Sequence, residues 1–170
     1  MDVAGVRVNE AGAQPMRWSE LESDDCPVAR AMAVLGDRWT VLILRDALRG
    51  VSRFDAFHER LECSRTLIAR RLAHLVAEGV LQAEAYQARP PRHDYRLTEA
   101  GRALGVVVML MAQWGETWRP KAGAPPLRRR HKACGHEFQP TVVCSECGDP
   151  IGKDGVEYPA YPRPMRSSIA

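Results

Sequence analysis

Apolar residues recur at helical spacing in five segments of the chain between residues 26 and 118. Each segment begins or ends with a helix signal, such as proline at the first helical position, an Asp, Ser or Thr cap, or a terminal glycine. The third and fourth segments are joined by a break so short that the pair is typical of a helix-turn-helix. The pattern predicts helices over residues 26–35, 37–50, 52–61, 64–79 and 98–118.

Residues 80–86 change from helical to alternating spacing, and residues 94–97 are typical of a return strand. The connection between them contains Pro90 and Pro91, which confine it to a loop. We therefore expect a short β-hairpin after the helix-turn-helix. The predicted fold class is mainly α with a small β-hairpin wing, that is, a winged helix-turn-helix followed by a small C-terminal ribbon.

The helix predicted over residues 98–118 is almost continuously apolar from Ala103 to Ala112. This run is too short to cross a bilayer, which requires about 20 apolar residues. Because a helix that is apolar on nearly every side must bury every side, we expect one face to pack on its own domain and the other on a second copy. An ordinary core helix within a monomer is the alternative, although the chain offers little other core.

The net charge of +3 and the pI near 8.7 are only mildly basic, so the positions of the cations matter more than their total. The apolar stripe of segment 64–79 defines an inward face, and the outward positions near its start are those where a recognition helix reads bases. The proline-stiffened hairpin tip adds arginines suited to phosphate or minor-groove contacts. A solvated helix face is the alternative interpretation. The predicted DNA-contacting residues are Ser64, Arg65, Thr66, Ala69 and Arg70 in the helix and Arg89 and Arg92 in the hairpin.

Seven motifs between Asp25 and Trp118 occur in an order and spacing that are specific. They are Cys26-Pro-Val-Ala-Arg30, Leu35-Gly-Asp-Arg-Trp-Thr40, Leu42-Ile-Leu-Arg45, Arg53-Phe54, residues 64–79, Pro90-Pro91-Arg92 and Tyr95-Arg-Leu-Thr-Glu-Ala-Gly101. Together they resemble the HxlR-type bacterial transcription regulators. The resemblance implies a winged helix-turn-helix domain over residues 23–120, a homodimer formed through terminal helices, and a two-fold-related operator in double-stranded DNA. It also implies that segment 64–79 enters the major groove and that Trp39 is a core residue.

Cys26 stands at the start of the first predicted helix, where exposed amides and the helix dipole favour a thiolate. Some regulators of the resembled family sense oxidants or electrophiles through a cysteine at the matching place, whereas others keep it for packing. The resemblance therefore makes Cys26 a candidate thiol sensor and leaves buried, inert cysteine as the alternative. Cys63 is a candidate partner for a disulfide with Cys26 of the other subunit, or else a small apolar spacer.

The chain beyond Trp118 is divided by composition into a basic linker (121–130), a donor-rich segment (131–157) and a flexible C-terminal tail (158–170). The donor-rich segment contains the pattern ligand-x-x-Cys-Gly twice and resembles a zinc ribbon. A structural zinc ion would explain how so small a segment folds. His136 competes with His131 as the fourth donor, and a metal-free hairpin is the alternative. The predicted ligands are His131, Cys134, Cys144 and Cys147.

The leading functional hypothesis is a sequence-specific DNA-binding transcriptional regulator that responds to an oxidant, an electrophile or a small ligand. No nucleophile-base pair, phosphate loop or carboxylate pair indicates an enzyme. A dithiol redox enzyme using Cys144 and Cys147, and a zinc-ribbon adaptor for nucleic acid or protein, are the alternatives. Residues 1–22 are expected to be a flexible tail. Because residues 1–15 lack the apolar core of a secretory signal, we expect a cytoplasmic protein with no membrane partner.

Overall fold

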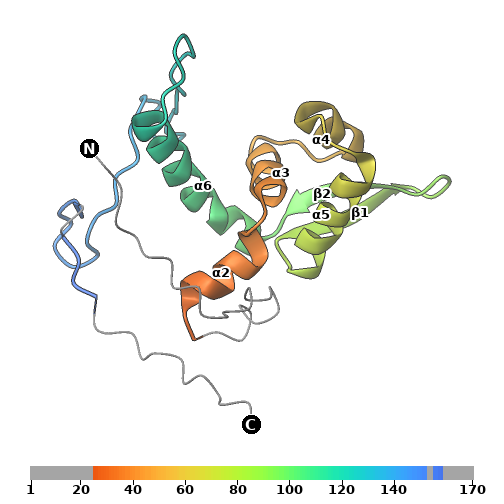
Figure 1. The fold of residues 1–170 in the computed structure, drawn as a ribbon, viewed down its shortest axis with the longest axis horizontal. Helices are drawn as coiled ribbons and strands as arrows, with labels where there is room; N and C mark the ends of the chain where they lie inside the picture. Colours follow the sequence, from red (N-terminus) through yellow and green to blue (C-terminus); the bar gives the residue numbers. More distant parts are fainter. Residues whose placement is uncertain (1–24, 153–154, 159–170) are drawn as a thin grey trace, which may run out of the picture. The chain divides into compact units, whose positions relative to one another are not determined.

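A computed structural model describes residues 25–152 and 155–158 of the 170-residue chain. The chain separates into two compact units: α2 (Pro27–Leu35) belongs to the first, and the second begins at Asp37. The second unit contains α3 (Arg38–Leu48), α4 (Phe54–Leu61), α5 (Arg65–Ala77), β1 (Leu81–Gln87), β2 (Arg92–Leu97) and α6 (Glu99–Trp118) (Figure 1). This order confirms the predicted winged helix-turn-helix. The tails predicted over residues 1–22 and 158–170 lie outside the described residues, apart from Tyr158.

The helix α2 begins and ends where the sequence predicts. Pro27 occupies its first position, where a missing amide hydrogen costs nothing, and Cys26 is the N-cap residue. At the other end the amide of Gly36 donates to the carbonyl of Met32 at 2.7 Å. Both ends of α2 are therefore explained by local sequence signals.

The core of the second unit is formed by α3, α4, α5 and the start of β1. The stripe predicted for α5 is buried as expected. On α4, Phe57 and Leu61 are buried, whereas Phe54 at the helix start is half-buried. Trp39 in the first turn of α3 is only half-buried, and the guanidinium of Arg38 lies 5.2 Å from the centre of its ring. The expectation that Trp39 is a core residue is therefore wrong, since a bulky ring at a helix end is seldom fully enclosed. The fully buried apolar side chains are Ile43, Leu44, Phe57, Ile68, Leu72, Leu75 and Leu81.

Two aspartates of the α3 region tie the three helices together. Asp37 caps α3 by accepting hydrogen bonds from the amides of Trp39 (2.9 Å) and Thr40 (3.3 Å), and its other oxygen pairs with Arg71 of α5 at 2.9 Å. Asp46 is completely buried and bound by arginines of α3 and α4. The orientation of α5 against α3 thus depends on a cap and an ion pair as well as on apolar packing.

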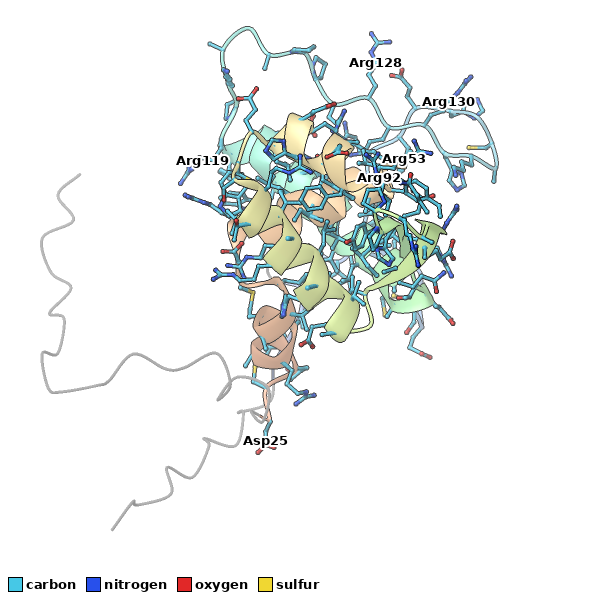
Figure 2. All side chains as sticks on the ribbon, turned by 90° about the vertical axis from the view of Figure 1, so that its right-hand side faces the viewer. Asp25, Arg53, Arg92, Arg119, Arg128 and Arg130 are labelled. Atoms are coloured by element: carbon cyan, nitrogen blue, oxygen red, sulfur yellow. The ribbon has the colours of Figure 1, made fainter. Side chains whose placement is uncertain are left out.

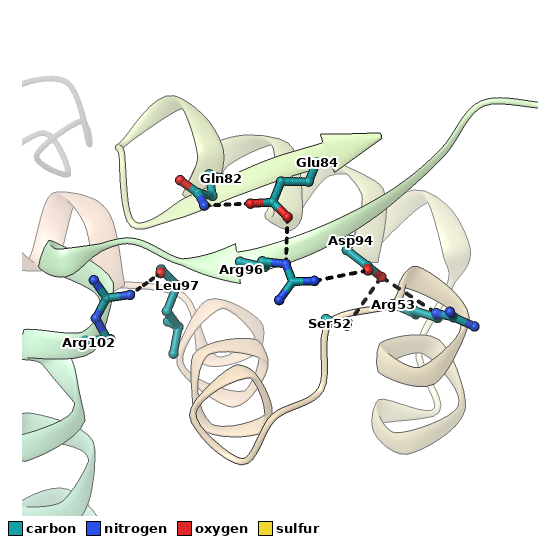
Figure 3. A network of polar contacts seen from close by, with 8 residues as sticks. All are labelled: Ser52, Arg53, Gln82, Glu84, Asp94, Arg96, Leu97 and Arg102. Atoms are coloured by element: carbon teal, nitrogen blue, oxygen red, sulfur yellow. Dashed lines mark hydrogen bonds and ion pairs between the residues drawn. The ribbon is translucent and has the colours of Figure 1, made fainter. Parts of the chain in front are cut away.

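The start of α4 differs from the prediction. We expected the helix to begin at Ser52, but it begins at Phe54 with Arg53 as the N-cap residue. Ser52 instead contacts β2: its hydroxyl donates to Asp94 at 3.4 Å (Figure 3). Its carbonyl accepts from the amide of Tyr95 at 2.7 Å. Because these partners come from β2, the residues before α4 anchor the hairpin to the helix-turn-helix.

The hairpin is longer than predicted at its second strand. The strands pair antiparallel with Leu81 opposite Leu97, and β2 begins at Arg92 instead of Asp94. Arg96 is held by Glu84 at 2.7 Å and by Asp94 at 3.7 Å (Figure 3). Figure 1 shows the loop between the strands projecting beyond α5. The hairpin is therefore a wing whose base is fixed by ion pairs and whose tip stands clear of the helices.

The long helix α6 is capped by Thr98, whose hydroxyl accepts from the amide of Gly101 at 3.1 Å and donates to the carbonyl of Gly79 at 2.6 Å. Gly101 is the single buried residue of α6. None of the helices in the described residues is long and apolar enough to cross a membrane. In one copy of the chain, α6 exposes the side chains of Val106, Val107, Met111, Trp114 and Trp118.

Candidate nucleic-acid interface

The start of α5 exposes every residue that the sequence predicts there: Ser64, Arg65, Thr66, Ala69 and Arg70. Ser64 has a structural task, because its hydroxyl caps the helix by accepting from the amide of Leu67 at 3.3 Å. The other four positions lie outside the core stripe. The helix therefore presents a polar face of the kind that a recognition helix offers to a groove.

The two predicted base-reading arginines differ in their surroundings. Arg65 forms an ion pair with Asp55 of α4 at 2.8 Å, and its guanidinium lies 4.8 Å from the centre of the Phe54 ring. Arg70 forms no hydrogen bond or ion pair with any residue that the structure describes. Arg65 is thus held against α4, whereas the donors of Arg70 remain available to a ligand.

Both predicted wing arginines are exposed. Arg89 lies in the loop and Arg92 is the first residue of β2, opposite Gln87. Neither guanidinium is bonded to another part of the described chain. The wing therefore carries two cations whose charge is not neutralised by a neighbouring carboxylate.

A cavity of about 240 Å³ lies between the start of α5 and the wing. It brings together Arg65 and Arg92 with a residue that the sequence-based site did not include, Arg53. Arg53 and Arg92 are labelled in Figure 2. The guanidinium of Arg53 lies 5.0 Å from the centre of the Tyr86 ring, and its Nε is 3.6 Å from Asp94. Its one signal in the sequence was its place in the Arg53-Phe54 motif of the family resemblance. The cavity is lined by Arg53, Phe54, Asp55, Arg65, Tyr86, Pro90, Pro91, Arg92, His93 and Tyr95.

Other cations of the same clusters are already neutralised inside the protein. Arg71 on α5 is paired with Asp37, and Arg96 on β2 with Glu84 and Asp94. Arg71 is half-buried and Arg96 is exposed, and both stabilise the fold through these ion pairs. The exposed cationic surface, hereafter the α5–wing surface, consists of Arg53, Arg65, Arg70, Arg89 and Arg92.

The candidate sensor thiol, Cys26, is half-buried at the N-terminus of α2, and its side chain does not cap the helix. Cys63 is half-buried in the turn between α4 and α5. All five cysteines lie in the described part of the chain, and none of them forms a disulfide there.

The predicted metal donors are brought together in two pairs. The Nδ1 atom of His131 lies 3.3 Å from Sγ of Cys134. Cys144 accepts hydrogen bonds from the backbone amides of Cys147 and Glu146, which lower the pKa of its thiol. The described residues contain no group of three or more His, Cys, Asp or Glu side chains arranged to hold a metal ion. The structure thus forms each of the two donor pairs of the predicted metal site, but it does not bring the two pairs together into one set of ligands.

Known proteins resemble this chain in both sequence and fold. Residues 34–122 match the model of the HxlR-like helix-turn-helix family. A relative from Mycobacterium tuberculosis, named an uncharacterized HTH-type transcriptional regulator, is 41% identical over 124 residues, which are 73% of this chain and 78% of the relative. The crystal structure of PA1607, a proposed transcription factor, has a TM-score of 0.72 at 32% identity and covers 81% of this chain and 96% of its own.

The redox regulator HypR in its reduced form has a TM-score of 0.52 at 32% identity, covering 55% of this chain and 94% of its own. The likeness falls on a winged helix-turn-helix with an exposed cationic α5–wing surface. This chain therefore belongs to the HxlR-like helix-turn-helix family and is a transcriptional regulator of that family.

Proposed function

We propose that the chain binds a two-fold-related operator in double-stranded DNA as a homodimer, with α5 in the major groove and the wing on the adjacent backbone. The observation that carries this proposal is the exposed, unpaired guanidinium of Arg70 on the outward face of α5. Arginine can donate two hydrogen bonds to guanine, which discriminates bases by about 1–3 kcal/mol. Arg89 and Arg92 supply charge for phosphate contacts, which increase affinity without reading sequence.

Duplex DNA from the region upstream of the gene tests this proposal by fluorescence anisotropy. Arg70→Ala is expected to prefer its operator over unrelated DNA by about 5- to 150-fold less than the unaltered protein does, which corresponds to the loss of about 1–3 kcal/mol of discrimination. Lys121→Ala removes the same charge from the exposed linker and serves as the control. Equal discrimination by the Arg70→Ala protein and the unaltered protein would contradict the assignment.

The homodimer is supported by the exposed apolar face of α6. Val107 is 44% exposed, and Trp114 and Trp118 are 56% and 64% exposed. A continuous apolar stripe of this kind is typical of a protein interface. Two copies of α5 would then stand at a fixed spacing, as a two-fold-related operator requires.

Sedimentation analysis tests the dimer. Val107→Glu is expected to convert the dimer to a monomer, because it places a charge in the proposed interface. Val143→Glu introduces the same charge at a valine that is 51% exposed outside α6, and it should leave the dimer intact. A monomeric unaltered protein, or an unaffected Val107→Glu dimer, would refute the interface.

The likeness to HypR, a redox regulator, supports Cys26 as the effector site. Oxidation by hydrogen peroxide would join Cys26 to Cys63 of the other subunit: two thiols lose two hydrogens, and the peroxide is reduced to water. Mild oxidation is expected to produce a cross-linked dimer on non-reducing gels. If the Cys26→Ser protein still cross-links, this assignment is removed.

A further inference from the structure

The chain beyond the linker contains two turns with the same backbone structure, separated by 13 positions. In each turn the amide of the first residue, His131 or Cys144, donates to the carbonyl of the residue five positions later. The amide of the fifth residue donates to the carbonyl of the first. A third bond closes the base of each turn. The matching pairs are His131 to His136 (2.9 Å) and Cys144 to Asp149 (2.9 Å), Gly135 to His131 (2.8 Å) and Gly148 to Cys144 (2.9 Å), and Phe138 to Arg129 (3.1 Å) and Ile151 to Val142 (2.8 Å).

The flanking bridges repeat as well: Arg130 pairs with Glu137 in the first turn and Val143 with Pro150 in the second. Each turn also needs glycine, because Gly135 and Gly148 have φ values of 74° and 77°. Residues with a Cβ atom seldom adopt this left-handed conformation. The two segments therefore form one structural unit that occurs twice, although their donor residues differ.

This correspondence decides which histidine matches a cysteine of the other turn. His131 occupies the position of Cys144, and Cys134 that of Cys147. His136 occupies the position of Asp149, and in both turns that residue contributes its backbone carbonyl to the turn. The structure thus favours His131 over His136 as the imidazole donor.

The donor spacing within the first turn suits one tetrahedral ion. With bonds of about 2.3 Å to sulfur and about 2.0 Å to nitrogen, tetrahedral zinc holds two such donors about 3.5 Å apart. Nδ1 of His131 and Sγ of Cys134 are 3.3 Å apart. Their separation therefore needs little change to hold an ion.

Apolar contacts contribute little to holding the two turns together. Pro140 is the only buried residue among the described residues 130–152. Val142 and Val143 are 48% and 51% exposed, and Ile151 is 37% exposed. A structural zinc ion contributes about 10–16 kcal/mol of apparent binding free energy at neutral pH, far more than so few apolar contacts supply.

We propose that the two turns are the halves of one structural zinc site, with His131 and Cys134 from the first turn and Cys144 and Cys147 from the second as ligands. Binding joins the halves by drawing the second donor pair to the first. A closed set of one nitrogen and three sulfur donors leaves no open position for substrate, so the ion is structural. The segment that forms the two turns is attached to α6 through Arg129, whose guanidinium binds Glu116 at 2.6 Å.

Metal analysis of the full chain, purified under reducing conditions and dialysed with zinc, tests the site. One zinc ion per chain is expected, falling close to zero in His131→Ala and Cys147→Ser. His136→Ala and Cys63→Ser are matched controls that keep the ion. Circular dichroism of the helices checks that each variant is folded, and it is independent of DNA binding.

Cobalt substitution provides a second readout. The Co²⁺ protein should show the strong absorption of a tetrahedral thiolate site, and the Cys144→Ser protein should lose much of the sulfur charge-transfer intensity. No zinc after dialysis, or zinc lost in His136→Ala and kept in His131→Ala, would overturn the proposal. One ion per two chains would also overturn it, because the ion would then join different copies.

Discussion

Replacing Asp46 by Asn should destabilise the protein strongly while preserving its shape. Asp46 is completely buried, and its two oxygens accept from Nε and Nη2 of Arg45 at 3.0 Å each. Nε of Arg60 on α4 lies 3.5 Å from the same carboxylate. Burial tends to raise the pKa of Asp46, but the hydrogen bonds and charges of Arg45 and Arg60 outweigh it and lower that pKa. The carboxylate is thus an ionised link between α3 and α4.

The expected loss of folding free energy depends on whether water can solvate Arg45 and Arg60 once the carboxylate is gone. Removing one member of a fully buried ion pair costs about 3–5 kcal/mol, because the remaining charge is stranded. The side chains of Arg45 and Arg60 are 34% and 47% exposed, so water can solvate them after the substitution. The loss of charged hydrogen bonds, about 1.5–3 kcal/mol, is then the better guide. For a chain of this length it lowers the melting temperature by roughly 5–10 °C.

Urea unfolding followed by circular dichroism, at neutral and acidic pH, measures this effect. A lowered pKa means that the carboxylate stabilises the fold above the ordinary aspartate pKa of about 4. That stability is lost as the pH falls through the lower value of the folded state. The difference between the unaltered protein and Asp46→Asn should therefore shrink below about pH 4.

The control is Asp55→Asn, which breaks the exposed pair with Arg65. It should change the free energy of unfolding by less than about 1 kcal/mol. The reasoning would be refuted if Asp46→Asn cost no more than this control at neutral pH. A difference that stayed constant in acid would refute the role assigned to the charge.

Three further changes test other parts of the structure. Gly101→Ala should destabilise the fold by about 2 kcal/mol in urea, because its Cβ would collide with the Val80 carbonyl oxygen, whereas Gly115→Ala, with nothing within 4 Å, should be neutral or stabilising. Arg92→Ala should weaken binding to all DNA sequences alike and reduce the salt slope of log K by about 1, as measured by anisotropy across a salt series. Glu116→Ala should speed tryptic cleavage after Lys121, since its carboxylate accepts from the Leu127 amide at 2.6 Å; unchanged cleavage would count against this anchor.

Local signals in the sequence were enough to place most helix ends. The caps Asp37, Ser64 and Thr98 act as predicted, because a cap bonds to amides two or three residues along the same chain. The two Cys-Gly turns were likewise visible as a repeated spacing. The likeness to the regulators rested on several short motifs in order, and it held for the whole winged helix-turn-helix.

The sequence could not show in the same way which arginines form ion pairs within the fold and which do not. Arg70 and Arg71 are neighbours with the same chemistry, yet Arg71 pairs with Asp37, 34 residues away, and Arg70 pairs with no described residue. Ser52 was expected to begin a helix, but its hydroxyl binds Asp94, 42 residues away. A helix cap is predictable because its partners are near in sequence, whereas the partner of an ion pair is chosen by the packing of distant elements. Tertiary structure alone therefore separates the arginines that form ion pairs within the fold, such as Arg71, from those that form none with the described residues, such as Arg70.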